Sequence, residues 1–353
     1  MLVVAVLSLM FLISRTTPCA ETSLNETVSN PMQAIVYECY GGPDVLTQKN
    51  VEVPSLKDDE ILVKVKAASV NPLDWHYMRG SPYLMRFDTG LGAPDDISLG
   101  VDFAGVVESV GANVQSFKVG DGVYGGADGA FAEYVKFREG RSVTHKPAAA
   151  TFEQAAAMPI AALTALQGLR DSGKLKSGQS VLINGSSGGV GTFAVQIAKS
   201  MGAEVTGVCS TRNIEMVLGL GADHVVDYKK EDFVTSGEQY DLIMDNVGNR
   251  SIAEYLKVLK PNGILVMIGG SKGDWLGPLK NILMAQLYAP FVNQELEFMI
   301  AEFNIADLDK LAELVQSGQV KPVIDRRYSL SEVPDAIRYS ESGRARGKIL
   351  ITM

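Results

Sequence analysis

The glycine cluster between Asn184 and Thr192 is the part of this sequence best suited to bind a ligand. It follows a short β-branched apolar run, 181–183, and leads into 192–199, whose apolar residues have helical spacing. Glycines let the backbone turn tightly and approach a ligand, and the N–H groups and dipole of a helix's first turn attract phosphate. The pattern predicts a dinucleotide pyrophosphate site. Its predicted residues are Ser186, Gly188, Gly189, Val190 and Gly191.

The spacing of these glycines departs from the usual fingerprint of a dinucleotide site. If Gly188 and Gly191 are the second and third glycines of a G-x-G-x-x-G motif, Ser186 stands at the first position. A literal G-x-G-x-x-A runs from Gly189 to Ala194, but it begins too far beyond the strand to form the turn. The motif alone is weak, because glycine-rich turns join strands to helices in many folds that bind nothing.

The segments that follow the glycine cluster strengthen the prediction. Strand-like runs alternate with helix-like ones, and the strand-like runs are 204–208, 223–227, 241–245 and 263–268. Such alternation is typical of a doubly wound parallel sheet. We therefore expect an α/β nucleotide-binding domain, the alternative being an α/β domain without a ligand.

The end of the second strand of this domain indicates which dinucleotide binds. An enzyme that uses NAD usually has an acidic residue there, about 20 residues beyond the glycines, to hold the ribose hydroxyls. This sequence has Ser210, Thr211 and Arg212 instead. Hydroxyls and a guanidinium bind a 2′-phosphate, which a carboxylate would repel. The predicted cofactor is NADPH, and the alternative is that Arg212 makes only a surface contact at a helix start.

Composition excludes other classes of protein. The chain has 353 residues, of which 46% are apolar and 21% charged, and its net charge of −9 argues against a nucleic-acid-binding surface. Cys19, Cys39 and Cys209 are too few and too scattered to predict a disulfide framework or a thiolate metal cluster. The three histidines share no ligand spacing, so no metal site is predicted.

The first 30 residues predict a signal or targeting segment. Residues 2–13 form an apolar run as long as a signal-peptide core and too short to span a bilayer, and cleavage is expected near Cys19 or Ala20. Entry into the secretory pathway is the first expectation, with no membrane span once the leader is removed. Arg15, with no acidic residue before Glu21, leaves import into a mitochondrion or plastid open, as does a leader that anchors the protein.

The region between the leader and the glycine cluster has a different organisation. The runs 33–37, 60–66, 101–110 and 130–136 are predicted strands separated by glycine and proline turns. The alanine-rich segment 152–169 predicts a helical bridge to the second lobe, and Pro159 inside it predicts a break between two helical pieces.

Several motifs together resemble the medium-chain dehydrogenase/reductase superfamily, and specifically its zinc-independent quinone oxidoreductase and enoyl reductase branch. They are 69–74 (SVNPLD), 99–107 (LGVDFAGVV), 119–123 (VGDGV), 155–159 (AAAMP), 163–165 (LTA), 220–223 (LGAD) and 347–350 (GKIL). The resemblance implies a GroES-like β lobe plus a Rossmann doubly wound parallel sheet. We expect the first part of the GroES-like catalytic domain over 31–151, the Rossmann domain over 152–290, and a return to the catalytic domain over 291–353. The resemblance also implies a homodimer.

The resemblance also suggests roles for individual residues. Zinc-dependent members have a cysteine ligand where this chain has Asn71-Pro72, and a Gly-His-Glu run where it has Gly100-Val101-Asp102, so no catalytic zinc is expected. The residues implied by the resemblance are Asn71 at the nicotinamide end, Tyr83 or else Tyr77 as a proton donor, Tyr228 beside the 2′-phosphate, and Asn246 and Gly269 near the nicotinamide ribose.

These observations predict an NADPH-dependent reductase of quinones or α,β-unsaturated carbonyls that needs no metal. Hydride from a nicotinamide would reduce a small conjugated acceptor, and the protein would position it and stabilise the charge on its oxygen. Two alternatives remain open. One is an enoyl thioester reductase, and the other is a redox-sensing or partner-binding protein that binds NADPH without turnover.

Overall fold

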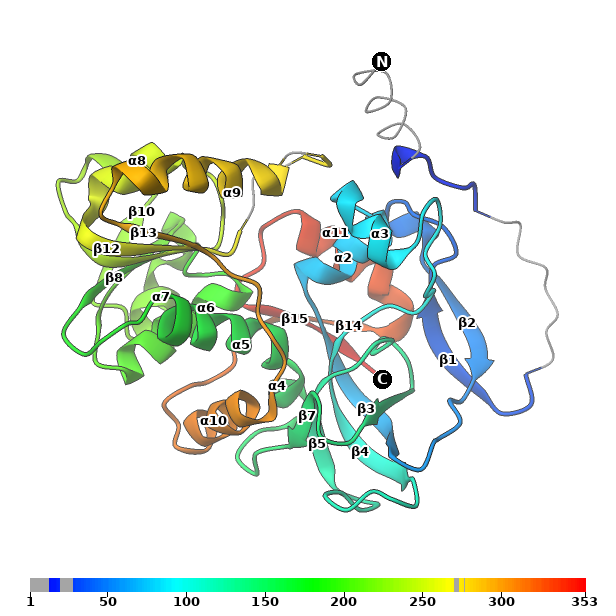
Figure 1. Ribbon diagram of the computed structural model, residues 1–353. Coiled ribbons are helices and arrows are strands. Elements are labelled where there is room, and N and C mark those ends of the chain that lie inside the picture. Colours follow the sequence, from blue (N-terminus) through cyan, green and yellow to red (C-terminus); the bar gives the residue numbers. More distant parts are fainter. Residues whose placement is uncertain (1–12, 20–27, 270–272, 276) are drawn as a thin grey trace.

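The chain forms two lobes, each built around its own β-sheet (Figure 1). This is seen in a computed structural model that describes residues 13–19, 28–269, 273–275 and 277–353. One lobe combines the first third of the chain with its last residues, and the other is formed by the stretch between them. The predicted fold class, a GroES-like β lobe plus a Rossmann sheet, is confirmed.

The Rossmann lobe contains six parallel strands in the order β10-β9-β8-β11-β12-β13. Their bounds are β8 Ser180–Asn184, β9 Glu204–Cys209, β10 His224–Asp227, β11 Tyr240–Asp245, β12 Leu259–Met267 and β13 Glu295–Phe298. After β8 the chain moves to β9 on one side, and later returns to β11 on the other. This reversal of direction is the place where doubly wound sheets bind ligands, at the carboxyl ends of the strands.

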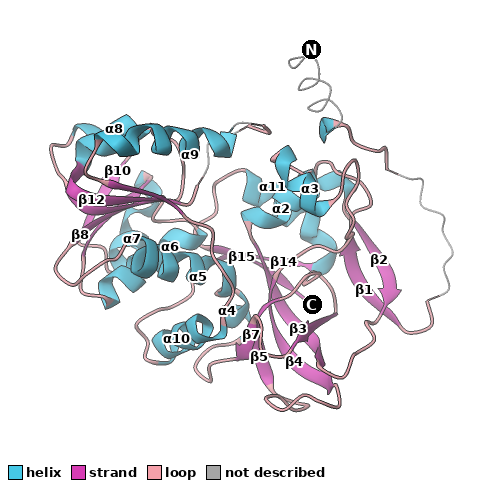
Figure 2. Cartoon of the chain, in the orientation of Figure 1, coloured by secondary structure: helices cyan, strands magenta, loops and turns pink. Residues whose placement is uncertain are grey.

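Helices cover both faces of the Rossmann sheet, as Figure 2 shows. They are α5 Pro159–Gln167, α6 Gly189–Ser200, α7 Ile214–Gly219, α8 Ile252–Val258 and α9 Gly277–Tyr288. Alternate residues of β8 enter different cores: Val181 and Ile183 pack with α5 and α6, and Leu182 packs with α8. A strand buried on both faces reads as a continuous apolar run, which is why 181–183 was recognisable in the sequence.

The catalytic lobe contains a seven-stranded sheet and a separate hairpin. In the sheet the order is β14-β15-β3-β4-β5-β7, with β6 also paired to β3, and the hairpin pairs β1 with β2. The bounds are β1 Pro31–Val36, β2 Thr47–Glu52, β3 Glu60–Val70, β4 Asp102–Val110, β5 Gly122–Gly126, β6 Tyr134–Arg138, β7 Val143–His145, β14 Ile324–Ser329 and β15 Lys348–Thr352. The lobe also contains the helices α2 Pro72–Arg79, α3 Arg86–Thr89 and α11 Val333–Glu341, of which α11 packs against β15 and β3.

The helical bridge between the lobes is broken as predicted. Helix α4 (Phe152–Ala156) ends just before α5, which begins at Pro159. Proline has no N–H and is tolerated in the first turn of a helix, so it starts α5 instead of interrupting a longer helix. Helix α10 (Ile305–Gln316) also joins the lobes, because its Leu308 carbonyl accepts a 2.6 Å hydrogen bond from the Tyr124 hydroxyl of β5.

The return to the catalytic lobe lies later in the chain than predicted. Strand β13, at Glu295–Phe298, pairs with β12 and forms the edge of the Rossmann sheet, so the boundary predicted at residue 290 falls inside that lobe. The chain rejoins the sheet of the catalytic lobe at β14, Ile324–Ser329, which pairs with β15. The alternating pattern Glu-Leu-Glu-Phe of β13 was too short to be recognised in the sequence.

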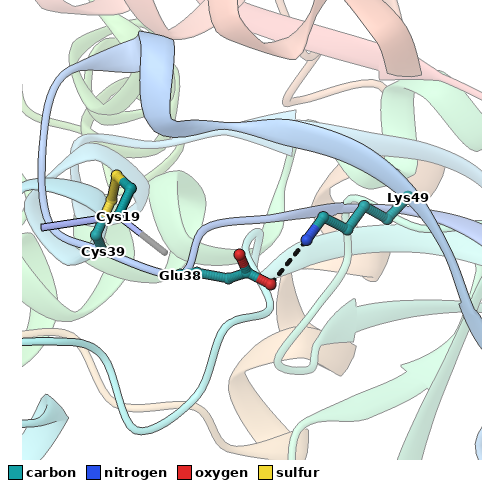
Figure 3. Close-up of a disulfide and its surroundings, with 4 residues drawn as sticks. All are labelled: Cys19, Glu38, Cys39 and Lys49. Atoms are coloured by element: carbon teal, nitrogen blue, oxygen red, sulfur yellow. Dashed lines mark hydrogen bonds and ion pairs between the residues drawn. A yellow bond between two sulfur atoms is a disulfide. The ribbon is translucent and has the colours of Figure 1, made fainter. Parts of the chain in front are cut away.

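The cysteines correct a second prediction. Cys19 and Cys39 form a disulfide with a Cα–Cα distance of 5.0 Å, which Figure 3 shows beside the ion pair of Lys49 with Glu38. Cys209 is a buried free thiol. Spacing along the chain could not reveal the pair, because the fold of 13–19 against the catalytic lobe brings the two sulfurs together.

Residues 13–19 pack against the catalytic lobe. The guanidinium of Arg86, which is 1% exposed, donates to the carbonyls of Ile13 at 2.9 Å and Arg15 at 3.0 Å, and Thr17 N–H donates to the Gly92 carbonyl. The other predicted leader residues that precede β1, 1–12 and 20–27, lie outside the described residues. No helix in the described parts of the chain has the length and hydropathy needed to cross a bilayer.

Candidate functional site

The glycine cluster forms a tight turn at the carboxyl end of β8. Gly188 caps α6, and a Cβ on Gly191 would lie 2.1 Å from the Gly185 carbonyl oxygen, so a side chain cannot fit there. A Cβ on Gly188 would meet nothing closer than 3.5 Å, which leaves the space in front of the helix open. Ser186 at the first motif position is fully buried, and its hydroxyl donates to the Val208 carbonyl. This open cradle with free first-turn N–H groups fits a diphosphate.

The residues predicted to bind the adenosine end surround the carboxyl end of β9. Ser210 is buried, and its hydroxyl accepts from the Asn213 amide, which also donates to Ser187 in the glycine turn. Thr211 donates its hydroxyl proton to the buried Asp227 carboxylate at 2.6 Å, a bond that holds the pKa of Asp227 below its usual range.

Two further predicted residues lie at the surface on this side. Arg212 donates to the Arg344 carbonyl at 2.6 Å, which brings the guanidinium to the loop that precedes β15. Tyr228 directly follows β10, and its side chain is exposed. The structure therefore gathers Ser210, Arg212 and Tyr228 on the two neighbouring strand ends where a ribose would lie.

Asn246 and Gly269 follow the next two strands and touch each other. A Cβ on Gly269 would lie 2.6 Å from the Asn246 carbonyl, so only glycine allows this close approach. The Asn246 amide donates to the Asn184 carbonyl at 3.0 Å, whereas its Oδ1 is buried without a hydrogen-bond partner among the described residues. An acceptor left unpaired at the carboxyl edge of the sheet fits a ligand that donates a hydrogen bond there.

Asn71 lies in a buried polar network at the start of α2. Its amide nitrogen donates to Asp102 at 2.8 Å, its Oδ1 accepts from the Lys348 ammonium, and its backbone N–H donates to Asp74 at 2.7 Å. Burial raises the pKa of Asp102 and lowers that of Lys348, and it raises the pKa of Asp74 to about 8. The described residues offer no hydrogen-bond partner to the buried Oδ1 of Asp74. A buried oxygen without a partner is more costly on a charged carboxylate than on a neutral carboxyl, so this environment favours the protonated form.

A cavity of about 760 Å³ lies between the two lobes. Ile268, at the end of β12, and Thr164 of α5 come from the Rossmann side, while Tyr77 and Asp128 come from the catalytic lobe. Burial, followed by the charge of Asp128, raises the pKa of Tyr77 above its usual value. The rest of the lining has an apolar part, which includes Leu73, Val101, Ile160, Leu163, Phe298, Met299, Ile300 and Phe303. It also has a charged part, formed by Glu60, Lys136, Arg138, Arg141 and Glu302.

Tyr83 lies outside the lining of this cavity. The Arg86 guanidinium stacks over its ring at 4.5 Å, and the Trp275 ring meets its edge at 5.0 Å. Its backbone N–H donates to the Asp274 carbonyl of the Rossmann lobe, so Tyr83 joins the two lobes beside the cavity. His76 is also absent from the lining, and its Nδ1 contacts the Ser81 carbonyl at 2.5 Å.

Comparison with known proteins decides the family. The model of the alcohol dehydrogenase GroES-like domain matches residues 57–148, and that of the zinc-binding dehydrogenases matches residues 220–351. A 2-methylene-furan-3-one reductase of Solanum lycopersicum is 35% identical over 94% of this chain and 82% of its own. The mitochondrial NAD(P)H oxidoreductase RTN4IP1 of Bos taurus is 36% identical over 92% of this chain and 90% of its own.

The chain belongs to the medium-chain dehydrogenase/reductase superfamily, as its motifs indicated. A solved structure of the Escherichia coli quinone oxidoreductase complexed with NADPH aligns with a TM-score of 0.78 and 27% identity, over 91% of this chain and all of that one. These likenesses place this medium-chain reductase in the quinone oxidoreductase branch, whose members use a nicotinamide cofactor.

The zinc named by one family model does not fit this medium-chain reductase. By the resemblance, the zinc-ligand positions of zinc-dependent members hold Asn71-Pro72 and Gly100-Val101-Asp102 here, and the Lys348 ammonium lies against Asn71 and Asp102. No group of three or more histidine, cysteine, aspartate or glutamate side chains that could hold a metal occurs in the described part of the chain. An ammonium repels a second cation, and valine cannot coordinate one.

Sequence reasoning missed the residues that the topology contributes. Lys348 reaches Asn71 from the other end of the chain, and only the pairing of β15 with β3 brings them together. Asp74 and Asp128 stood in the sequence as ordinary polar residues. The sequence did contain one signal for this contact. Lys348 lies within the motif GKIL at 347–350, and a lysine in an otherwise apolar strand indicates a buried polar partner.

Proposed function

We propose that the protein is an NADPH-dependent reductase of quinones and α,β-unsaturated carbonyl compounds that works without a metal. The observation that carries this proposal is the cavity between the lobes, which joins the carboxyl edge of the Rossmann sheet to a largely apolar wall with the Tyr77 hydroxyl and Asp128. A flat conjugated molecule fits the apolar part of this lining, formed by residues such as Leu73, Ile160 and Leu163, beside the Tyr77 hydroxyl. The relatives named as a 2-methylene-furan-3-one reductase and a quinone oxidoreductase support this substrate class.

The protein's part in the reaction is positioning and proton delivery. Bound NADPH supplies the hydride that a conjugated acceptor takes at carbon or oxygen. The Tyr77 hydroxyl, which is protonated at neutral pH like any tyrosine, donates to the acceptor's carbonyl oxygen as negative charge develops there. Asn71 acts by position, because Asp102 and Lys348 engage its amide.

The tyrosines provide a matched test of this mechanism. NADPH oxidation is measured with a quinone, an enal and an enoyl-CoA for the wild type, Tyr77→Phe and Tyr83→Phe. With the enal we expect Tyr77→Phe to lower kcat about 100-fold, the low end of the effect of a general acid, and Tyr83→Phe to change it little. A large loss of kcat in Tyr83→Phe and little change in Tyr77→Phe would identify Tyr83 as the proton donor, as the family resemblance implied.

The same assay separates the alternative functions. A preference for the enoyl-CoA would identify an enoyl thioester reductase. Tight NADPH binding without turnover of any of the three substrates would identify a redox sensor or a partner-binding protein. Turnover of the quinone and the enal in preference to the thioester is the result that we expect.

We propose that the protein prefers NADPH over NADH because of the residues that directly follow β9. Ser210, Arg212 and the exposed Tyr228 converge there, and no carboxylate at 210–213 would repel a 2′-phosphate. Asp227 is nearby, but its carboxylate is bound to Thr211. We expect Arg212→Ala to weaken binding of 2′,5′-ADP about tenfold, because a charge-assisted bond is lost, and to leave 5′-AMP binding unchanged. Unchanged affinity for 2′,5′-ADP would contradict the assignment.

A homodimer is proposed through the edge of the Rossmann sheet. Strand β13 is an edge strand, and α9, which contacts it, exposes Leu283 and Leu287, followed by the exposed Phe291. Exposed apolar stripes beside an unpaired strand edge are typical of subunit interfaces. Light scattering after gel filtration should give twice the mass of one chain for the wild type, and one chain for Leu287→Asp. A monomeric wild type would refute the proposal.

Entry of the protein into an oxidising compartment is proposed from the disulfide of Cys19 with Cys39, because disulfides persist there and are rare in the cytosol. The contacts of Arg86 with Ile13 and Arg15 support retention of residues 13–19 after targeting. Sequencing the N-terminus of the protein purified from its native cells should find a start before Ile13. A start after Ala20, or a protein with two free thiols at 19 and 39, would contradict this.

A further inference from the structure

Lys348 is a buried cation at the junction of the two lobes. It is the first residue of β15, its side chain is 3% exposed, and its ammonium contacts Asn71 Oδ1 and lies 3.5 Å from Asp102 Oδ2. A lysine is almost never fully buried unless it is paired, because removing the ammonium from water is costly. The mechanism described above uses no charge at this place, so its presence needs a reason.

The network around Asp102 is closed. Its carboxylate accepts from the Ser69 hydroxyl at 3.0 Å, from the Asn71 amide at 2.8 Å and from the Ile160 N–H at 3.1 Å, besides the Lys348 ammonium. These partners come from β3, the start of α2 and the start of α5. Together with Lys348 they fix both ends of the Asn71 amide, so neither end can turn toward the cavity.

The same lysine also touches the glycine turn. The Gly347 N–H donates to the Ser187 carbonyl at 3.0 Å, and Gly347 forms a parallel bridge with Gly188. The stem of Lys348 runs past Gly189, the first residue of α6, where a Cβ would lie only 3.2 Å from Lys348 Cδ. One side chain therefore contacts the turn that fits the cofactor's diphosphate and the residue that begins α2.

Helix α2 carries the substrate side of the site. Leu73 and Tyr77 project from it into the cavity, and Asn71 immediately precedes it. A change in the position of Asn71 moves the start of this helix and hence the Tyr77 hydroxyl. By the family resemblance, zinc-dependent members have metal ligands in the segments that correspond to Asn71-Pro72 and Gly100-Val101-Asp102. In this chain the Lys348 ammonium lies against one residue of each segment, Asn71 and Asp102.

We propose that Lys348 is a positioning residue that holds α2, and with it Tyr77, in a fixed relation to the cofactor turn. Its ammonium fills the place that a metal ion takes in zinc-dependent relatives and bridges Asn71 to Asp102. The catalytic part of this inference rests on the proposed reductase function, and its structural part does not. The ammonium transfers no proton and touches no substrate.

The test needs a variant that removes the ammonium without leaving a lone buried charge. Lys348→Met alone leaves Asp102 unpaired and is expected to lower the melting temperature. The double variant Lys348→Met/Asp102→Asn is neutral and keeps the shape of both side chains, so it should fold as well as the wild type. Lys118→Met, an exposed lysine on the same lobe, is the matched control.

For the double variant we expect kcat for the enal to fall at least tenfold, with the affinity for 2′,5′-ADP within about twofold of the wild type. Adding Tyr77→Phe to the double variant should lower kcat by a much smaller factor than adding it to the wild type, because the effects of residues that act together are not additive. A double variant with wild-type kcat, or a full additional loss from Tyr77→Phe, would show that Lys348 serves stability alone.

A second readout does not depend on turnover. The protein has two tryptophans, and with Trp275 replaced by phenylalanine only Trp75, which lies on α2, remains. NADP⁺ should change the emission of Trp75 in the Trp275→Phe protein but not when Lys348→Met/Asp102→Asn is added. The same response in both proteins would overturn the positioning role even if no substrate were ever turned over. A Trp75 response in a protein that reduces none of the three substrates would refute the reductase and keep the coupling.

Discussion

Replacing Asp74 with asparagine tests whether a neutral carboxyl supports the active site. Asp74 is fully buried in α2, its Oδ2 accepts the Asn71 N–H, and burial raises its pKa from 3.8 to about 8. Because the folded protein holds this proton more tightly than the unfolded chain, the stability due to Asp74 is complete below pH 4 and is lost as the pH rises through 8. Between these limits the free energy of unfolding falls by about 1.4 kcal/mol per pH unit.

Asparagine keeps an oxygen for the Asn71 N–H and has no proton to lose. From about pH 6 to pH 8 the wild type should therefore lose about 2 kcal/mol of stability that the Asp74→Asn variant keeps. Urea denaturation followed by circular dichroism at pH 6, 7 and 8 measures the difference, and Asp88→Asn, at an exposed position of α3, is the control. Parallel stability curves for the wild type and Asp74→Asn would refute the assignment of a neutral buried carboxyl.

Three further changes test other parts of the fold. Gly191→Ala places a Cβ 2.1 Å from a carbonyl oxygen and should abolish binding of NADP⁺ in calorimetry, whereas Gly219→Ala, with open space around it, should stabilise α7 by about 1 kcal/mol. Cys39→Ser removes the disulfide and should cost about 3 kcal/mol in urea denaturation, and a reductant should have the same effect on the wild type but none on the variant. Tyr124→Phe removes the buried bond to the Leu308 carbonyl and should lower the stability by about 1 to 3 kcal/mol, and an unchanged midpoint would show that the bond between the lobes contributes nothing.

The parts of the fold with local signals could be predicted from the sequence. The glycine turn after 181–183 was recognisable because a strand buried on both faces, a glycine cluster and a helix start are neighbours in the chain. Pro159 likewise marked a helix boundary by its own chemistry, since it lacks the N–H that a continuing helix needs.

The parts set by distant pairing could not be predicted in this way. Lys348 joins Asn71 and Asp102 only after β15 has paired with β3, and Cys19 reaches Cys39 only because 13–19 folds back onto Arg86. Which tyrosine faces the cavity depends on the direction in which α2 presents Tyr77, whereas the family resemblance favoured Tyr83 and left Tyr77 as the alternative.

The pairing of β15 with β3 also determines the order in which the molecule can be completed during its synthesis. The ribosome makes β15 after β3 and after the entire Rossmann lobe between them, yet β15 lies between β3 and β14 in one sheet. Domains generally fold as their sequence emerges, so the inserted lobe is finished while the first sheet still has an open edge at β3. That apolar edge stays unpaired until β15 has been made, and until then it can bind other nascent chains or a chaperone.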